Sequence, residues 1–286
     1  MFVLTCSQSW AHSFWINTFF SQGHQSPHVM ASLGWGHSLP MDDILTSTNG
    51  RVAVDSFALI DPTGALVPLR HPDFFVSSPE QSTPNVDVYA ADLAVHKIAL
   101  KKESTQGVYQ FSAVTKPSYY VQYIDSKGRK RLKMKPLDEV KDVAQTLMAV
   151  KYQAYAKSMV THGDWNTPEP LGHSLEIVPR SDLSHVKVGD LIEVEVLFYG
   201  KPLNSSPKSK EFMTAQSTGF GQQDGFALYS KLKKGRAQFR VQSPGQWLIN
   251  VGHKDDVTED GPLRELFGKA HQLYQSASLT FTVSGS

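Results

Sequence analysis

The sequence predicts a mainly β protein built from two antiparallel β-sandwich domains, the second of them immunoglobulin-like. Short runs of alternating apolar and polar residues, rich in β-branched and aromatic types, recur along the 286 residues. Turn sequences such as Asp61-Pro62-Thr63-Gly64 and Asp125-Ser126-Lys127-Gly128 separate neighbouring runs, because Pro fixes φ and Gly tolerates positive φ. The length of the chain also suits two domains of ordinary size.

The first sandwich is expected over residues 12–136. Residues 72–87 hold three prolines among serines and predict an exposed loop between its strands. The strands are expected at residues 14–16, 29–37, 51–60, 65–69, 93–101, 107–113 and 119–124.

Residues 137–172 are expected to be a helix and a linker between the domains. Apolar residues recur at helical spacing over residues 137–160, and this segment contains neither Gly nor Pro. The alternative is an extended connection, since residues 150–160 also suit a strand. Residues 161–172 contain Gly163, Pro168 and Pro170, which is typical of a linker.

The second sandwich is expected over residues 173–286, which is about the size of an immunoglobulin-like module. Its strands are expected at residues 175–179, 192–199, 237–241, 246–252 and 277–283.

The composition excludes several classes of protein. A net charge of +1 argues against a nucleic-acid partner, and the basic run at residues 127–133 is best explained as a charged edge strand that resists edge-to-edge pairing. No apolar run approaches the length of a membrane span. The only cysteine, Cys6, precedes the predicted mature chain, and no Gly-x-Ser-x-Gly motif occurs. We therefore do not expect an enzyme.

Residues 1–11 predict the end of a signal peptide. Ser9 and Ala11 fit the small residues that precede a signal-peptidase site, so cleavage after Ala11 would leave His12 as the first residue of a periplasmic protein. The leader lacks a basic start, which suggests that the true start lies upstream. The alternative is an ordinary cytoplasmic N-terminus that keeps Met1.

Six phrases together resemble the secreted bacterial family of periplasmic nickel/cobalt-transport components, much of which is described as a domain of unknown function. The phrases are Ala11-His12-Ser13-Phe14-Trp15, Leu33-Gly34-Trp35-Gly36-His37-Ser38-Leu39-Pro40, Leu175-Glu176-Ile177-Val178-Pro179, Gly189-Asp190-Leu191, Val196-Leu197-Phe198-Tyr199-Gly200-Lys201-Pro202-Leu203 and Pro244-Gly245-Gln246-Trp247-Leu248-Ile249. The resemblance implies an exported β protein associated with transition-metal uptake. In this family a histidine commonly begins the mature chain, and it corresponds to His12. The histidine of the Gly-x-Gly-His-x-x-Pro phrase corresponds to His37. The histidine that follows the Pro-Gly-x-Trp strand corresponds to His253.

These three histidines are the predicted metal ligands. An amino-terminal His12 would bind through its amine and ring, and with His37 and His253 it would form an all-nitrogen site that suits nickel, cobalt or copper, or zinc as a tetrahedron. Four carboxylates are candidate supports that would orient the imidazoles or attract the cation, and His162 is a possible additional ligand. The carboxylates are Asp42, Asp43, Asp255 and Asp256. His24 and His28 have chelating spacing, but their surroundings predict a loop.

The expected function is periplasmic binding of nickel or cobalt and delivery to an inner-membrane uptake system. Metal loading should fall as the pH drops below the ordinary histidine pKa of about 6.5, because the ligands must lose their protons. One alternative is a non-catalytic cell-envelope module that binds a protein or glycan. A third hypothesis is a copper-dependent oxidative polysaccharide-cleaving enzyme, which would hold copper through an amino-terminal histidine and a second histidine.

Overall fold

The computed structural model describes residues 12–21, 28–45, 52–73, 75–203, 212–221 and 227–285. Strands dominate these residues, and the helices among them are the short 3₁₀ turns η1 (Leu137–Glu139) and η2 (Arg264–Leu266), so the predicted mainly β fold is confirmed. None of these helices has the length and apolar character needed to cross a membrane. The predicted signal peptide and His24 lie outside the described residues.

The strands, in chain order, are β1 (Ser13–Ser21), β2 (His28–Gly36), β3 (Val54–Ile60), β4 (Leu66–Pro68), β5 (Gln81–Ser82), β6 (Asp87–Val88), β7 (His96–Ala99), β8 (Gly107–Thr115), β9 (Ser118–Asp125), β10 (Lys130–Lys133), β11 (Val143–His162), β12 (Leu175–Pro179), β13 (Leu191–Phe198), β14 (Lys201–Pro202), β15 (Phe212–Ser217), β16 (Leu228–Lys231), β17 (Arg236–Arg240), β18 (Gly245–Asp256) and β19 (Gln272–Val283).

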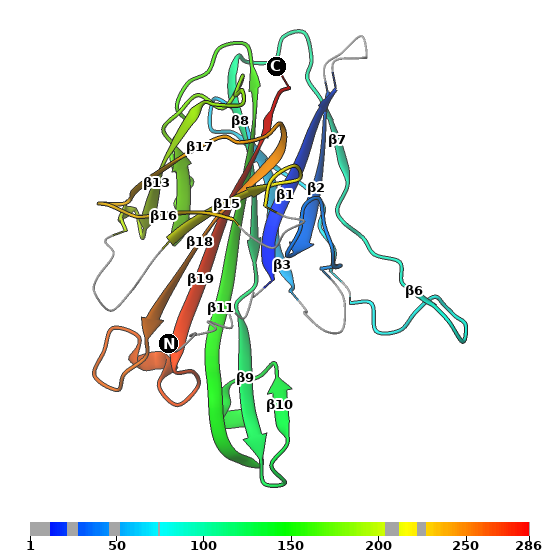
Figure 1. Ribbon diagram of the computed structural model, residues 1–286, viewed down its shortest axis with the longest axis vertical. Coiled ribbons are helices and arrows are strands. Elements are labelled where there is room, and N and C mark those ends of the chain that lie inside the picture. The colour runs from blue at the N-terminus through cyan, green and yellow to red at the C-terminus, as the bar shows by residue number, and fades with distance from the viewer. Residues whose placement is uncertain are drawn as a thin grey trace, which may run out of the picture.

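Three layers of sheet form the body of the molecule (Figure 1). A ten-stranded sheet lies in the middle, in the order β16-β15-β18-β19-β11-β8-β3-β4, with β9 paired to β11 and β10 paired to β9. A three-stranded sheet, β1-β2-β7, covers one face of this central sheet. A four-stranded sheet, β12-β13-β14 with β17 paired to β13, covers the other face.

Side chains of the central sheet alternate between the two outer layers, as the two-residue period of a strand requires. On β19, Leu279 and Phe281 belong to the core shared with the four-stranded sheet, together with Ile177 and Trp247. Thr280, which lies between Leu279 and Phe281 along β19, faces the other way, and its hydroxyl donates a hydrogen bond to the Ile16 carbonyl of the three-stranded sheet. The core under that sheet is formed by residues such as Phe14, Leu33, Trp35, Phe57 and Phe111.

The predicted helix over residues 137–160 is wrong, and the extended alternative is right. β11 pairs antiparallel with β8 and β9, and parallel with β19 on its other side. Ala154 and Ala156 enter the core under the three-stranded sheet, whereas Tyr155 and Met159 enter the opposite core. A strand buried on both faces has a nearly continuous run of apolar residues, and such a run matches helical spacing as well as strand spacing.

β11 also changes how the two predicted domains relate to each other. It joins strands of residues 12–136 to strands of residues 173–286 in one sheet. The two predicted sandwiches therefore share their middle layer.

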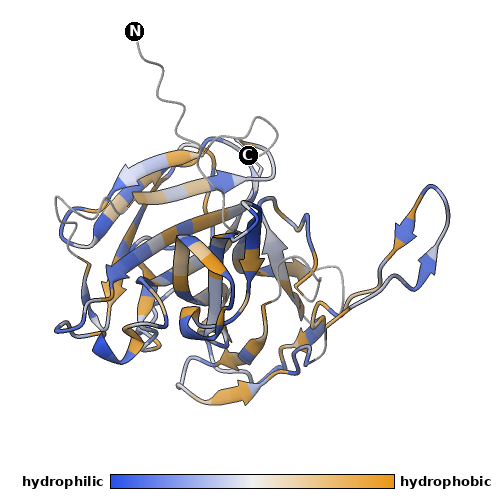
Figure 2. Ribbon diagram, turned by 90° about the horizontal axis from the view of Figure 1, so that it is seen from below, coloured by the Kyte–Doolittle hydropathy of each residue, from blue (hydrophilic) through white to orange (hydrophobic). Residues whose placement is uncertain are grey.

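The segment predicted as an exposed loop, residues 72–87, is exposed along most of its length. It contains β5 and the first residue of β6, and these two strands pair with each other as an antiparallel hairpin. The hairpin stands away from the layered body (Figures 1 and 2).

Candidate metal-binding site

Two of the three predicted histidine ligands lie side by side. The ring centroids of His12 and His37 are 4.4 Å apart, with the ring planes inclined by 39°. His12 directly precedes β1 and His37 directly follows β2. Because these strands pair antiparallel with Ser13 opposite Gly36, the pairing brings the start of one strand and the end of the other together.

Each imidazole faces its own carboxylate. Nε2 of His12 lies 3.1 Å from Oδ2 of Asp43, and Nδ1 of His37 lies 3.6 Å from Oδ2 of Asp42. The His12 ring also stacks on the buried Trp35 ring, with centroids 5.3 Å apart and planes 7° from parallel. The four polar side chains are between 28% and 38% exposed, so a cation can reach them from solvent.

The loop that carries His37, Asp42 and Asp43 is held at several points. The carbonyl of Pro40 accepts hydrogen bonds from the Trp15 indole at 3.1 Å and from the Asn17 amide at 2.9 Å. The carbonyl of His37 accepts a bond of 3.0 Å from the Gln216 side chain of the central sheet. Asp42 caps the start of the loop by accepting a 2.6 Å bond from the backbone N–H of His37.

Both glycines of the Gly34-Trp35-Gly36-His37 phrase are required by close contacts. A Cβ at Gly34 would lie 2.1 Å from Nε1 of Trp15. Gly36 has φ +124°, and a Cβ there would lie 1.7 Å from Oδ1 of Asp42. The phrase that carries the family resemblance therefore shapes the floor of this site.

The electrostatics of the site favour a neutral imidazole at position 12. Burial lowers the pKa of His12, and the neighbouring His37 lowers it further, against the opposing effects of Asp43 and Asp42. A neutral imidazole is the form that binds a metal.

The four polar side chains form two separate His–Asp pairs. Among the described residues, no three His, Cys, Asp or Glu side chains converge so as to hold a metal ion. Nε2 of His12 faces Asp43, so Nδ1 is the ring nitrogen that can close a chelate with the α-amino group of the same residue. A metal at His12 and His37 would therefore need the free α-amino group of His12 as a further ligand.

The structure does not bring His253 to this site. Along β18, Leu248 packs on Trp15, and Asn250 donates a 3.2 Å hydrogen bond to the Ser13 hydroxyl, so these even-numbered residues face the three-stranded sheet. His253 points to the opposite face, where its ring centroid lies 4.4 Å from that of Phe198 in β13. The backbone of the central sheet therefore separates His253 from His12, and the predicted three-histidine set is reduced to two.

The remaining predicted supports are also elsewhere. Asp255 accepts a 3.0 Å hydrogen bond from the His253 ring, and Asp256 accepts one of 2.9 Å from Gln272. His162 lines a cavity of about 450 Å³ together with Phe20, near the end of β1 that is distant from His12. Phe20 lies eight residues along the chain from His12, which in a strand corresponds to about 25 Å.

Other residues of the site were not predicted. Trp35 provides the surface on which His12 stacks, and Trp15, Asn17 and Gln216 hold the loop. Trp15 and Trp35 lie within the phrases that carry the resemblance, and this proximity is a signal that could have identified them. Gln216 has no comparable signal in the sequence.

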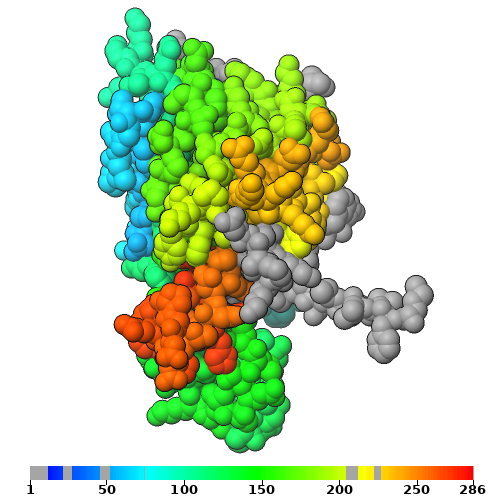
Figure 3. Space-filling model, turned by 90° about the vertical axis from the view of Figure 1, so that its left-hand side faces the viewer, coloured from blue at the N-terminus to red at the C-terminus, as the bar shows by residue number. Residues whose placement is uncertain are grey.

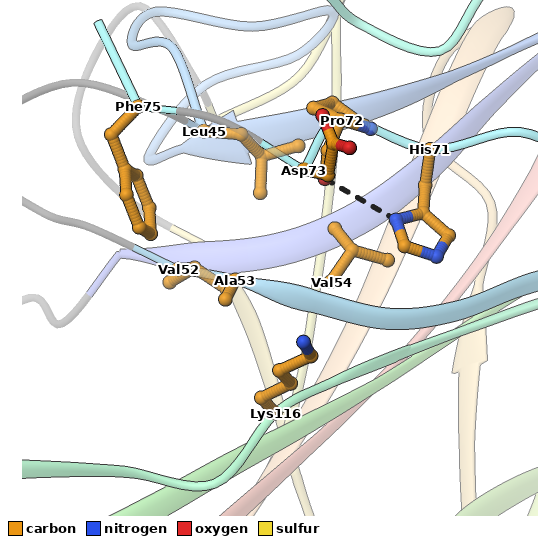
Figure 4. A pocket seen from close by; sticks show the side chains of 9 residues that line it. All are labelled: Leu45, Val52, Ala53, Val54, His71, Pro72, Asp73, Phe75 and Lys116. Carbon is orange, nitrogen blue, oxygen red and sulfur yellow. Dashed lines mark hydrogen bonds between the residues drawn. The ribbon is translucent and has the colours of Figure 1, made fainter.

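Two further cavities are weaker candidates for an active site. Oγ of Ser112 lies 2.9 Å from Nε2 of His173 beside a cavity of about 460 Å³, but burial lowers the pKa of His173 to about 4, which makes it a weak general base. The cavity in Figure 4 measures about 70 Å³, and the ring of His71 at its edge donates to the Pro72 carbonyl at 3.2 Å. Such a volume is small for a ligand site.

A family model described as a domain of unknown function, DUF4198, matches residues 9–255. The match covers most of the chain. This protein belongs to the DUF4198 family. The match begins just before His12 and contains the whole site, so the predicted relation to a domain of unknown function is confirmed. A search of curated proteins gave no match.

Proposed function

We propose that this DUF4198 protein binds a divalent transition metal, nickel or cobalt, at His12 and His37. The observation that carries the proposal is the pair of imidazoles, 4.4 Å apart and open to solvent, at the meeting point of two paired strand ends. Asp42 and Asp43 beside them supply negative charge that attracts a cation. Binding is reversible coordination without turnover.

The proposed coordination follows from the directions of the ring nitrogens. The α-amino nitrogen and Nδ1 of His12 form a chelate, while Asp43 holds the other side of that ring. The imidazole of His37, whose Nδ1 lies near Asp42, supplies the third nitrogen ligand. Three nitrogen ligands with carboxylates nearby suit nickel, cobalt and copper, and also zinc.

The proposal requires processing after Ala11, because the preceding peptide bond would otherwise occupy the amine of His12. It therefore includes export to the periplasm, where the protein would pass its metal to an inner-membrane uptake system. The resemblance to periplasmic nickel/cobalt-transport components supports this location and this partner.

The test uses protein whose first residue is His12, titrated with Ni(II), Co(II), Cu(II) and Zn(II) in a calorimeter. His12→Ala and His37→Ala should each weaken Ni(II) binding by about 100-fold, because each removes direct ligands. His253→Ala is the matched control and should bind as the wild type does. An additional residue before His12 should weaken binding as much as His12→Ala. Unchanged Ni(II) affinity in both ligand variants would refute the proposal.

The same pair of histidines favours a second candidate, a copper-dependent oxidative enzyme. An amino-terminal histidine beside another histidine on a β-sandwich surface is the ligand set that this chemistry requires. A marked Cu(II) preference together with peroxide production in the presence of a reductant would support it. A protein that binds none of the four metals would instead support the non-catalytic module that recognises a protein or glycan.

A further inference from the structure

The first projecting element is the acidic arm, which we define as residues 73–92. It contains four acidic residues and no Lys or Arg. The β5–β6 hairpin forms its outer part and leaves the body to one side (Figures 1 and 2). Val86, Val88 and Tyr89 near its tip are 59%, 46% and 48% exposed. A two-stranded hairpin with little cover is marginally stable in water, so a partner surface would stabilise it.

The second projecting element is the basic hairpin, residues 125–135, which runs from the last residue of β9 through the turn and β10. It contains six Lys and Arg residues and one acidic residue, Asp125, whose carboxylate pairs with Arg129 and Arg131. The formal charge of this segment is therefore 6 − 1 = +5. Since the whole chain carries +1, the rest of the protein carries 1 − 5 = −4. The basic hairpin thus carries a net positive charge, whereas the rest of the chain carries a net negative charge.

An apolar face accompanies these charges. Leu132 on β10 lies opposite Gln122 on β9, which in turn lies opposite Met148 on β11, so these side chains share one face of the projecting strands. Leu132 is 50% exposed and Met148 is 37% exposed. The other face holds a small core that contains Val121 and Tyr123. The projecting strands form a lobe at the lower end of the molecule in Figure 3.

We infer that the acidic arm of one copy of this protein docks on the basic hairpin of a second copy. The two surfaces have opposite charge, and each exposes apolar side chains that the contact would cover. They leave the body in different directions, which suits a contact between two molecules (Figure 1). Reciprocal contacts related by a two-fold axis would close a dimer.

The Lys and Arg side chains of β10 limit how this contact forms. β10 pairs with β9 on one side, and the lysines and arginines along it disfavour edge-to-edge strand pairing. The contact is therefore made by side chains across the apolar face. Because it depends on charge attraction between exposed groups, it weakens as salt rises.

The test measures the self-association of the purified full-length protein by analytical ultracentrifugation. A dimer is expected at low salt, and dissociation is expected in about 1 M salt, where screening is nearly complete. An arm variant, Glu80→Lys with Asp87→Lys, and a hairpin variant, Lys127→Glu with Lys130→Glu and Lys133→Glu, should each weaken self-association at least tenfold. The control Lys231→Glu with Lys233→Glu and Lys234→Glu makes the same charge change as the hairpin variant, at exposed lysines at the end of β16 and between β16 and β17, and should dimerise as the wild type does.

The decisive experiment combines the two sets of substitutions, which change the outer part of the arm, residues 80–89, from −2 to +2 and the basic hairpin from +5 to 5 − 6 = −1. A chain that carries both the arm and the hairpin substitutions, and a mixture of the two separate variants, should each recover dimers. Failure of either recovery would overturn the inference, as would a wild type that stays monomeric at low salt. A monomer whose basic hairpin binds anionic lipid vesicles would also overturn it and would assign this surface to membranes. None of these outcomes depends on metal binding.

Discussion

The two faces of the central sheet carry out different tasks. On the face towards the three-stranded sheet, polar side chains of the central sheet bond to the outer layer beside an apolar core. Ser278, Thr280 and Asn250 bond to β1 or its start, and Gln216 bonds to the loop of His37. Opposite them, residues such as Trp247 and Leu279 form a continuous apolar core. Hydrogen bonds are directional, whereas apolar burial is not. The polar contacts therefore fix the position of β1 and of His12, while apolar burial on both faces stabilises the layers.

One ion pair interrupts the apolar face. Nζ of Lys157 lies 2.7 Å from Oε1 of Glu176, and both side chains are at most 2% exposed. Burial lowers the pKa of Lys157, while Glu176 opposes that change. Burial alone would raise the pKa of Glu176, but Lys157 and the N–H groups of Leu171 and Gly172 hold it below its usual value. The pair joins β11 to β12.

The largest expected effect comes from breaking this pair. Glu176→Ala should lower the free energy of unfolding by about 3–5 kcal/mol, because it leaves the Lys157 ammonium buried without its partner. Urea denaturation measures the change. Glu195→Ala is the control, since its partner Arg180 is 35% exposed and the loss should be about 1 kcal/mol or less. Equal losses in the two variants would contradict the contrast between a buried and an exposed pair.

The next expected effect is a dependence of stability on pH that arises from His173. Burial lowers the pKa of this imidazole to about 4 in the folded protein, from 6.5. Between these values the unfolded chain binds a proton that the folded protein does not, so stability is complete above pH 6.5 and falls as the pH drops towards 4. The loss at pH 4 should be about 3 kcal/mol.

Urea denaturation at several pH values tests this dependence. His173→Gln should reduce the slope of stability against pH, and the exposed control His185→Gln should keep it. A slope that is unchanged in His173→Gln would show that other groups are responsible.

A smaller effect is expected at the polar face, where the site is built. Gly36→Ala should weaken Ni(II) binding about tenfold, because the added Cβ would displace Asp42 and with it His37. Gly64→Ala is a matched control, since Gly64 also has a positive φ, of +86°, but has open space around its Cβ position. Titration calorimetry measures both variants. Equal affinities would mean that the position of Asp42 does not matter for binding.

The smallest expected effect tests a single bond between the layers. The hydroxyls of Thr18 and Ser158 are 2.7 Å apart and buried. Thr18→Val should lower the free energy of unfolding by about 1 kcal/mol, because it removes the bond but keeps the volume. Thr18→Ser keeps the hydroxyl and should retain the coupling to Ser158 in a double-mutant cycle. A cycle with no coupling energy would show that the polar contacts contribute nothing to holding β1.

The strands were predictable where one face of a strand is exposed or polar. β1, β2, β8, β9 and β18 lie close to their predicted ranges, because their alternation follows the two-residue period. For β11 the sequence left a helix and a strand both open, since burial on both faces of much of the strand removes the alternation. The parallel pairing of β11 with β19 is also a long-range contact that no local pattern contains.

The candidate site was predictable only where it depends on residues close together in the chain. His12 and His37 occupy the ends of two strands that are neighbours in the chain and pair directly, so their closeness follows from local connectivity. His253 also lies towards the end of a strand, but its distance from the other two depends on the face it occupies. That face is set by the register of β18 in the central sheet.

The sequence by itself determined the β class, the paired ends of β1 and β2, and the Gly-Trp-Gly-His phrase that shapes the site, because all of these depend on residues close together in the chain. The tertiary structure alone decided that β11 completes a shared middle sheet and that His253 faces away from His12. Both outcomes depend on how distant strands pair. A shift of one residue in such a pairing would move every side chain of a strand to the opposite face.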